Sequence, residues 1–145
     1  MYYKGKYTPK NPKKYIGNPS EIIYRSLWEL KFMKYCDLTT NISEWSSEPF
    51  AIPYLCPTDK KKHKYFPDFY IKVNELNGTT HKYVIEIKPE KQTKPPKKRK
   101  KTKNYLYEQL TYIKNIAKWK HAKQYCKKRN WKFKILTENE IQPYK

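Results

Sequence analysis

Apolar residues recur every three to four positions in two parts of the chain, which is the spacing of one helix face. In the first part, Ile23, Leu27 and Leu30 follow one another at this spacing. Asparagine, proline and serine at positions 18–20 are residues that commonly open a helix. We therefore predict a helix from about residue 20 to residue 37, with these three apolar side chains buried.

The second part is longer and lies near the C-terminus, where it predicts a helix over about 104–129. The face expected to be buried consists of Leu106, Leu110, Ile113 and Ala117. Asn130 follows this run, and asparagine tolerates the left-handed backbone that often ends a helix. The helix is therefore expected to stop there.

Elsewhere the pattern is the alternation typical of strands. The expected strands cover residues 42–45, 50–54, 66–73, 82–88 and 131–135. The first two would pair across Glu48-Pro49. The third and fourth would form a hairpin, because Asn77-Gly78 is a strong signal for a tight turn. The order of elements predicts an α/β fold with a central mixed sheet flanked by helices.

Two segments lack any periodic apolar pattern. Residues 1–19 are basic and rich in tyrosine and proline, and we interpret them as an N-terminal arm lying on the domain or on a partner. Residues 88–103 are dominated by lysine, and Pro95-Pro96 is incompatible with a helix, so a flexible basic loop is expected. Residues 20–145 would then form a single domain.

The charge of the chain adds a function class to this fold. Lysine and arginine number 33 and aspartate and glutamate 13, which gives a net charge of +20 over 145 residues. Nucleic acid is the favoured partner, because lysines that neutralise phosphates release counterions. An anionic membrane surface or a merely solvated basic surface are the alternatives. Because lysine greatly outnumbers arginine, we expect contacts to the phosphate backbone with little direct reading of bases.

Other composition features mainly exclude possibilities. No stretch approaches the roughly 20 apolar residues of a membrane span, and the first residues lack the apolar run of a signal peptide. Cys36, Cys56 and Cys126 do not have metal-ligand spacing, and we expect reduced thiols. No small-molecule cofactor is expected.

Candidate chemistry lies on the predicted hairpin. Strand side chains alternate, so Glu86 and Lys88 share a face, and Asp68 has the same parity on its own strand. Two neighbouring carboxylates favour a cation between them, and oxygen ligands favour Mg²⁺ or Mn²⁺. Lys88 could then hold the attacking water or stabilise charge on phosphorus. Glu29, from the first helix, could supply a further carboxylate.

Each of these features has an ordinary structural explanation when taken alone. An acid-x-lysine on a strand is usually a solvated face or a cross-strand ion pair, and Glu29 with Arg25 is by default a helix ion pair. Their conjunction in a strongly basic protein favours metal-assisted phosphodiester cleavage.

Pro67-Asp68 and Glu86-Ile87-Lys88 resemble the signature of the PD-(D/E)xK nucleases. The surrounding stretches that resemble the TnsA-like branch of these endonucleases are Tyr24–Glu29, Ile52–Tyr54, His63–Phe69 and Ile85–Pro89. The stretches that resemble the head-completion nucleases of T-even-like tailed phages are Thr8–Gly17, Tyr105–Tyr112 and Phe133–Glu138. The resemblance spans nearly the whole chain.

The resemblance implies a restriction-endonuclease-like fold and a Mg²⁺-dependent DNA endonuclease, with Mn²⁺ as the other candidate ion. Asp68, Glu86 and Glu29 would hold the metal, and Lys88 would be the catalytic lysine. The implied task is the processing or trimming of packaged double-stranded DNA ends at the portal, before neck or tail attachment. Portal or neck proteins would be partners, in the host cytoplasm during assembly or at the head–neck junction of the virion.

Contacts to DNA are expected around these acids, in the basic loop and on the second helix, where Gln109 resembles part of a glutamine-tyrosine helix of RecB-type nucleases. Arg25 could equally well only pair with Glu29. The expected DNA-contacting residues are Arg25, Ser26, His63, Lys91, Gln92, Lys97, Lys98, Arg99, Lys100, Lys101 and Gln109.

Two other functions stay open at this point. One is a non-catalytic, basic DNA-binding structural protein of the head–neck junction, against which the complete set of acids and lysine argues. The other is a transposon or restriction endonuclease directed by a partner protein, against which the small size of the chain argues.

Overall fold

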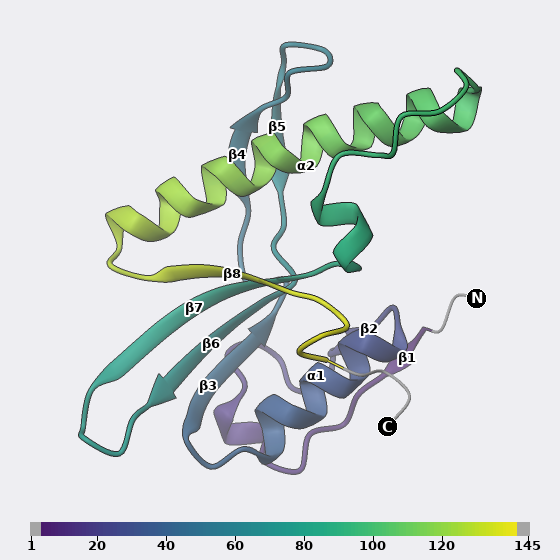
Figure 1. The fold of residues 1–145 in the computed structure, drawn as a ribbon. Coiled ribbons are helices and arrows are strands. Elements are labelled where there is room, and N and C mark those ends of the chain that lie inside the picture. The colour runs from purple at the N-terminus through teal and green to yellow at the C-terminus, as the bar shows by residue number, and fades with distance from the viewer. Residues whose placement is uncertain (1–3, 142–145) are drawn as a thin grey trace.

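A mixed four-stranded sheet forms the centre of the computed structural model, which describes residues 4–141 (Figure 1). In spatial order its strands are β3 (Ile42–Ser47), β6 (Phe69–Asn74), β7 (Thr80–Ile87) and β8 (Lys132–Leu136). The first three are antiparallel neighbours, and β8 pairs with β7 in parallel. Helix α2 (Lys103–Lys128) supplies the crossover that a parallel pair requires. The predicted α/β class and the β6–β7 hairpin are confirmed.

The two faces of this sheet are covered by different helices. Alternate strand residues such as Phe69 and Ile85 pack in one core cluster with Phe32 and Met33 of α1 (Leu27–Leu38). The opposite face packs against α2, where Trp119 donates a hydrogen bond to Glu86 of β7. The sheet therefore separates a core made with α1 from a second core made with α2.

The first helix begins later than its apolar spacing predicts. Ile23 belongs to a short strand, is 38% exposed and pairs with the N-terminal segment. Ser26 caps the helix by accepting a hydrogen bond from the backbone N–H of Glu29 at 3.1 Å. The short strands are β1 (Gly5–Lys6) and β2 (Ile23–Tyr24), and the buried residues of α1 are Phe32, Met33, Cys36 and Asp37. Ile23 was wrongly placed on the buried helix face, because the chain is still extended there, whereas Leu30 does pack against the core cluster.

The N-terminal segment is fastened to the C-terminal end of α1. The buried Asp37 carboxylate accepts hydrogen bonds from the Tyr7 hydroxyl and from the backbone N–H groups of Lys10 and Asn11. The Lys14 ammonium, in the short helix η1 (Pro12–Lys14), donates to three carbonyl oxygens at the end of α1, at 2.7 to 3.0 Å. These bonds satisfy carbonyls that a helix end would otherwise leave unpaired.

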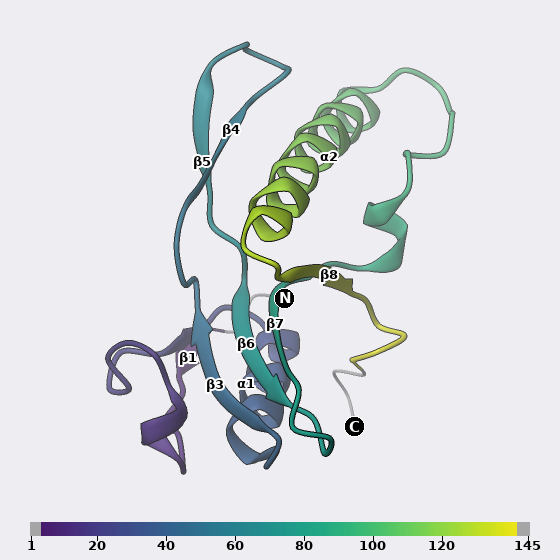
Figure 2. The ribbon, with the colours of Figure 1, turned by 90° about the vertical axis from the view of Figure 1, so that its left-hand side faces the viewer.

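The predicted pairing of residues 42–45 with 50–54 was also wrong. Strand β3 pairs with β6, whereas β4 (Ile52–Leu55) pairs with β5 (Lys62–Tyr65) in a separate two-stranded hairpin. Glu48 has a φ of 46°, and Pro49 follows it, so the chain turns out of the central sheet at this point. Figures 1 and 2 show the β4–β5 hairpin running beside α2 and ending beyond it.

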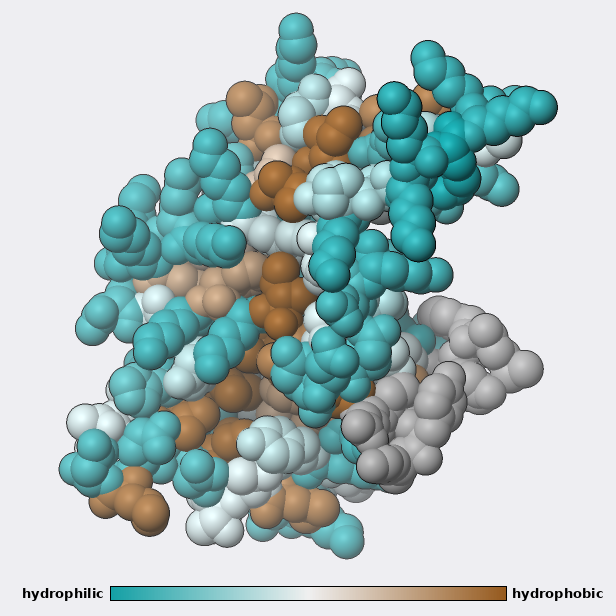
Figure 3. Space-filling model, in the orientation of Figure 1, coloured by the Kyte–Doolittle hydropathy of each residue, from teal (hydrophilic) through white to brown (hydrophobic). Residues whose placement is uncertain are grey.

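The bounds predicted for α2 agree with the structure, but of its predicted buried face only Ala117 packs against a core cluster. The buried residues of this helix are Tyr105, Asn115, Trp119, Ala122 and Cys126. Leu106, Leu110 and Ile113 are 45 to 48% exposed. The N-terminal half of α2 extends past the sheet (Figure 1), so its apolar residues lack a partner layer, and Figure 3 shows apolar side chains at this surface.

The remaining local predictions are mostly confirmed. Asn130 ends α2 with a φ of 60°, and the three cysteines are free and buried. The basic loop contains one short helical turn, η2 (Glu90–Thr93), which the sequence did not predict. No helix between residues 4 and 141 combines the length and apolarity needed to cross a membrane.

Candidate active site

Two carboxylates meet where β6 begins and β7 ends. Asp68 directly precedes β6 and Glu86 is the penultimate residue of β7. Their side chains interact directly, because after burial the charge of Glu86 is the largest influence on the pKa of Asp68. The Asp68 carboxylate also accepts the backbone N–H of Ile87 at 2.7 Å. The antiparallel register, which places Phe69 opposite Ile85, produces this contact. The two acids therefore lie together, as strand parity predicted.

The electrostatics of this pair favour either a shared proton or a bound cation. Burial raises the pKa of Asp68 well above its usual value, and the negative charges of Glu86 and Glu29 raise it further. The hydrogen bond from Ile87 acts in the opposite direction. Two carboxylates in contact cannot both ionise without a compensating positive charge.

Glu86 is fixed by two neutral donors that the sequence analysis did not assign to the site. Its Oε2 atom accepts the Tyr65 hydroxyl at 2.6 Å and the indole N–H of Trp119 at 3.1 Å. Glu86 is only 5% exposed. Trp119 is itself buried, and its ring nitrogen orients the acid. No local sequence pattern signals this role, because the contact joins α2 to the sheet.

Glu29 approaches the pair from the first turn of α1. Burial is the largest influence on the Glu29 carboxyl and raises its pKa, while Arg25 and the Ser26 hydroxyl act to lower it. The negative charge of Glu29 also raises the pKa of Asp68. All three acids named from the sequence therefore belong to one electrostatic cluster.

Two lysines border the acids. Lys88 follows β7, and its backbone N–H donates to the Leu136 carbonyl of β8 at 3.0 Å. Lys118 of α2 is half-buried; burial lowers its pKa, the charge of Lys88 lowers it further, and Glu86 raises it. Lys118 is thus close to both Glu86 and Lys88. It was not among the residues predicted from sequence, where it is one of many lysines on a basic helix.

Several residues expected to contact DNA already have protein partners. Arg25 pairs with Glu48 at 2.8 Å, so the expected side-chain pair with Glu29 is not formed. Ser26 is the cap of α1. His63 lies on β5, with its Nε2 atom 2.7 Å from the Asp59 carboxylate.

The basic loop lies against the overhanging half of α2 and encloses a cavity of about 940 Å³ between them. Lys91 and Gln92 line the loop side of this cavity, and the buried Asn115 lines the α2 side. Arg99 donates two hydrogen bonds to Glu108, at 3.0 and 3.1 Å, so its guanidinium is already engaged. Gln109 donates to the Tyr105 hydroxyl at 3.0 Å.

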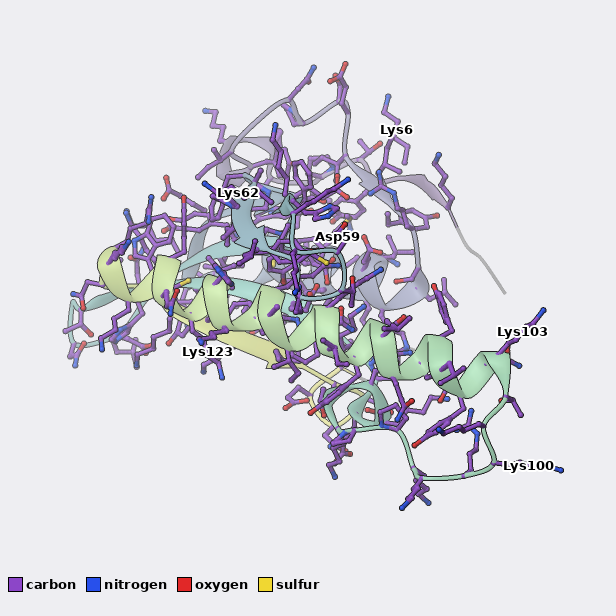
Figure 4. The ribbon with its side chains drawn as sticks, turned by 90° about the horizontal axis from the view of Figure 1, so that it is seen from above. Lys6, Asp59, Lys62, Lys100, Lys103 and Lys123 are labelled. Atoms are coloured by element: carbon purple, nitrogen blue, oxygen red, sulfur yellow. The ribbon has the colours of Figure 1, made fainter. Side chains whose placement is uncertain are left out.

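The loop lysines at 97, 98, 100 and 101 are exposed. In the view from above, Lys100 and Lys103 extend outward at the far end of α2 (Figure 4). These lysines therefore present unburied positive charge next to the cavity.

A small α/β domain that joins paired acids and lysines at one sheet end has the layout of a nuclease. Residues 39–138, which include Asp68, Glu86 and Lys88, match the family described as "TnsA-like endonuclease N terminal". The chain belongs to this family of TnsA-like endonucleases, and its mixed α/β sheet is consistent with the restriction-endonuclease-like fold that the sequence resemblance implied.

A particular relative extends this similarity beyond the family domain. The chain is 40% identical over 146 residues to the "Head completion nuclease" of Enterobacteria phage T4. The match covers 97% of this chain and 95% of the phage T4 protein. No solved structure matches the chain significantly.

Proposed function

We propose that this protein is a divalent-metal-dependent DNA endonuclease that acts in phage head completion. The observation that carries the proposal is the buried, interacting pair Asp68–Glu86, with Glu29 acting on Asp68 and Lys118 acting on Glu86. Endonuclease activity follows from the family, whereas the metal and the residue roles are inferred from this arrangement.

The acid cluster fits a hard divalent cation. Its donors are carboxylate oxygens, and burial followed by the negative charges of Glu86 and Glu29 raises the pKa of Asp68. Asp68, Glu86 and Glu29 would hold Mg²⁺ or Mn²⁺. When bound, such an ion activates water and offsets charge on a phosphate.

The protein's own side chains would supply the remaining contributions. Tyr65 and Trp119 hold Glu86 in one orientation through its Oε2 atom. Lys88 would orient the attacking water or stabilise the charge that develops on the phosphate oxygens. Lys118 adds a second cationic group on the α2 side of the acids.

The DNA backbone would pass from these acids along the cavity between the basic loop and α2. We propose Lys91, Gln92 and the exposed loop lysines as phosphate contacts, together with Arg25, Ser26 and Gln109 near the two helices. Arg99 is expected to contribute less, because Glu108 already holds its guanidinium.

The loop can be tested separately from the acids. Replacing residues 97–101 with alanine should weaken DNA binding and flatten its salt dependence, since each lost phosphate contact reduces the log–log slope by about 0.9. A Lys10→Ala, Lys13→Ala variant, altered on the N-terminal segment, is the control and should keep the slope. An unchanged slope in the loop variant would place the DNA elsewhere.

The biological task is proposed from the phage T4 relative, whose name is head completion nuclease. This chain would process or trim packaged double-stranded DNA ends at the portal before the neck or tail attaches. Portal or neck proteins are the proposed partners. The protein would act in the host cytoplasm during assembly, at the head–neck junction.

The central experiment is a nuclease assay on linear and supercoiled DNA, with Mg²⁺ or with EDTA. We expect wild-type protein to cleave only with the metal and Asp68→Ala not to cleave. Glu75→Ala, which alters an acid in the β6–β7 turn, is the control and should remain active. Cleavage of linear DNA alone would support end processing. Absence of cleavage with tight, salt-sensitive binding would contradict the enzyme and favour a structural DNA-binding role.

A further inference from the structure

The tip of the β4–β5 hairpin brings together three side chains with different donor atoms. This set differs in chemistry from the acids of the proposed nuclease site, which are all carboxylates. Cys56, Asp59 and His63 each offer one atom, a sulfur, a carboxylate oxygen and a ring nitrogen, and these atoms lie within 4.8 Å of one another. The hairpin register, which pairs Tyr54 with His63, places His63 across from the end of β4. Asp59 lies near the hairpin end in Figure 4.

The backbone of the tip holds these donors in place. The N–H of Cys56 donates to the Lys61 carbonyl at 2.9 Å, and the N–H of Lys60 donates to the Cys56 carbonyl at 2.8 Å. Lys60 has the left-handed φ of 59° that closes this turn. Asp59 Oδ1 accepts the backbone N–H of Lys61 at 2.9 Å, which leaves Oδ2 directed at His63. The donors are thus positioned by main-chain hydrogen bonds rather than by chance contact of long side chains.

We propose that Cys56, Asp59 and His63 form a second metal site, which binds Zn²⁺ through one sulfur, one oxygen and one nitrogen. Zinc accepts this mixed set in tetrahedral geometry and leaves a fourth position for water or an external ligand. A thiolate and an imidazole are poor ligands for Mg²⁺, which prefers oxygen. The ion at this site therefore differs in kind from the ion proposed for the acid cluster.

The charge balance of the site is compatible with a divalent cation, although lysines surround it. A thiolate and a carboxylate together carry two negative charges, which match the charge of the ion. The exposed lysines at positions 60, 61, 62 and 64 oppose an added cation. The hydrogen bond with the Thr58 hydroxyl lowers the pKa of Cys56, and the backbone of Lys61 lowers that of Asp59.

An ion has access to the site. The side chains of His63 and Asp59 are 43% and 42% exposed, whereas Cys56 is 2% exposed as a residue. A metal can therefore approach from the side of the histidine and the aspartate and contact the sulfur behind them. This assignment gives His63 a ligand role instead of the phosphate contact expected from the sequence.

A metal here would act as a staple for the hairpin. A two-stranded hairpin is marginally stable by itself, and this one projects beyond α2 with lysines at its end. Joining Cys56 before the turn to His63 after it would fix the position of these lysines. The spacing between cysteines does not reveal this group, because only one of its three donors is a cysteine.

Cobalt provides the direct test, because a thiolate bound to Co²⁺ gives a charge-transfer absorption that oxygen and nitrogen ligands do not give. The purified, untagged full-length protein would be stripped of metal and titrated with Co²⁺, and Zn²⁺ would then be added in competition. We expect one equivalent of Co²⁺ to produce the band and Zn²⁺ to abolish it. No band in the wild type would overturn the proposal.

Matched variants identify the ligands. Cys56→Ser should abolish the band, and His63→Gln should weaken Zn²⁺ binding by at least about tenfold, measured by calorimetry. Cys126→Ser and His81→Gln are the controls and should retain both properties. His63 is exposed, so its variant should stay folded even if Cys56→Ser does not. Unchanged Zn²⁺ affinity in His63→Gln would reject the site.

The Asp68→Ala protein separates this proposal from the nuclease mechanism. It lacks an acid of the cleavage site but keeps the whole hairpin tip, so the cobalt band should persist in it. Loss of the band in this variant, while the protein stays folded, would show that the thiolate site is not independent of the acid cluster and would overturn the proposal.

Discussion

The two faces of the central sheet differ in how completely their side chains are covered and in how their buried acids are paired. On the α1 face, apolar side chains are sealed by the helix and by the N-terminal segment, and the buried Asp37 carboxylate has hydrogen bonds from three donors. On the α2 face, the helix overhangs the sheet, leaves apolar residues exposed and covers a pair of acids in mutual contact.

The two buried acids make the difference measurable. Asp37 on the first face would have its pKa raised by burial, but the hydrogen bonds from Tyr7, Lys10 and Asn11 more than offset this and lower it. Burial also raises the pKa of Asp68 on the second face, and the charge of Glu86 raises it further instead of offsetting the effect of burial. At neutral pH the ionised Asp37 carboxylate stabilises the fold, whereas ionisation of Asp68 is unfavourable in the folded protein. The α1 face thus supports the structure, and the α2 face holds the charge that a substrate or ion would use.

The largest effect is expected from Lys88→Ala. Cleavage should fall by about 10³-fold or more, because Lys88 is the group proposed to orient water or to stabilise the phosphate charge. DNA affinity should change little, because the other basic residues of the loop remain. Single-turnover rates and binding isotherms measure the two properties, with the exposed Lys132→Ala as the control. An equal loss of both would make Lys88 only a phosphate anchor.

Asp37→Ala should produce a large loss of stability on the α1 face. The substitution leaves the Tyr7 hydroxyl and two backbone N–H groups without their acceptor, which we expect to cost about 3 kcal/mol. Urea denaturation at pH 7 gives this number. A loss below about 1 kcal/mol would mean that the N-terminal segment contributes little to the fold.

Asp68→Asn should act in the opposite direction in metal-free protein. It removes one charge from the carboxylate pair, and we expect the free energy of unfolding to increase by about 1 kcal/mol, together with loss of cleavage.

The pH dependence of stability follows from the directions in which the pKa values of Asp37 and Asp68 are shifted. The contribution of Asp37 is present above its ordinary pKa of 3.8 and is lost as the pH falls through its lowered folded value.

The ionised Asp68 carboxylate instead destabilises the folded protein at neutral pH. This destabilisation is relieved as the pH falls through the raised pKa of Asp68 in the folded state. Mild acidification should therefore narrow the stability difference between wild type and Asp68→Asn. Thermal melts in EDTA between neutral and mildly acidic pH measure it. A difference that widened on acidification would contradict the assigned direction.

The smallest effect is expected from Leu110→Ala. Leu110 is 48% exposed on the overhanging half of α2, so its removal should change stability by no more than about 0.5 kcal/mol. Phe32→Ala, at a residue 4% exposed on the α1 face, should cost about 3 to 5 kcal/mol. Similar costs for the two would mean that α2 is covered in solution.

The proximity of the two acids was more predictable than the packing around them. Asp68 and Glu86 could be placed together because the Asn77-Gly78 turn joins adjacent strands and side chains alternate along each. The role of Lys88 stays a prediction. The register is local, so it can be read from a single sequence. The supporting donors Tyr65 and Trp119 come from other elements, and no spacing in the sequence connects them to Glu86.

The errors concern where one layer ends and another begins. The apolar spacing of Leu106, Leu110 and Ile113 is correct for a helix face, but periodicity carries no information on whether a sheet lies beneath it. Strand β5 was missed because the lysines of residues 62–65 resemble a loop. Ile23 was assigned to a helix because two residues of extended chain cannot be distinguished from a first helical turn.

The position of β8 also sets the moment at which the site is completed while a ribosome makes the chain. Strand β7, which carries Glu86, is bordered on one edge by β8, and the Lys88 backbone is held by the Leu136 carbonyl. A nascent chain that has been synthesised only as far as the basic loop contains the three acids of the candidate site but neither Trp119 nor Leu136. We expect such a chain to be inactive, so the capacity to cut DNA arises only with the last strand and not during synthesis.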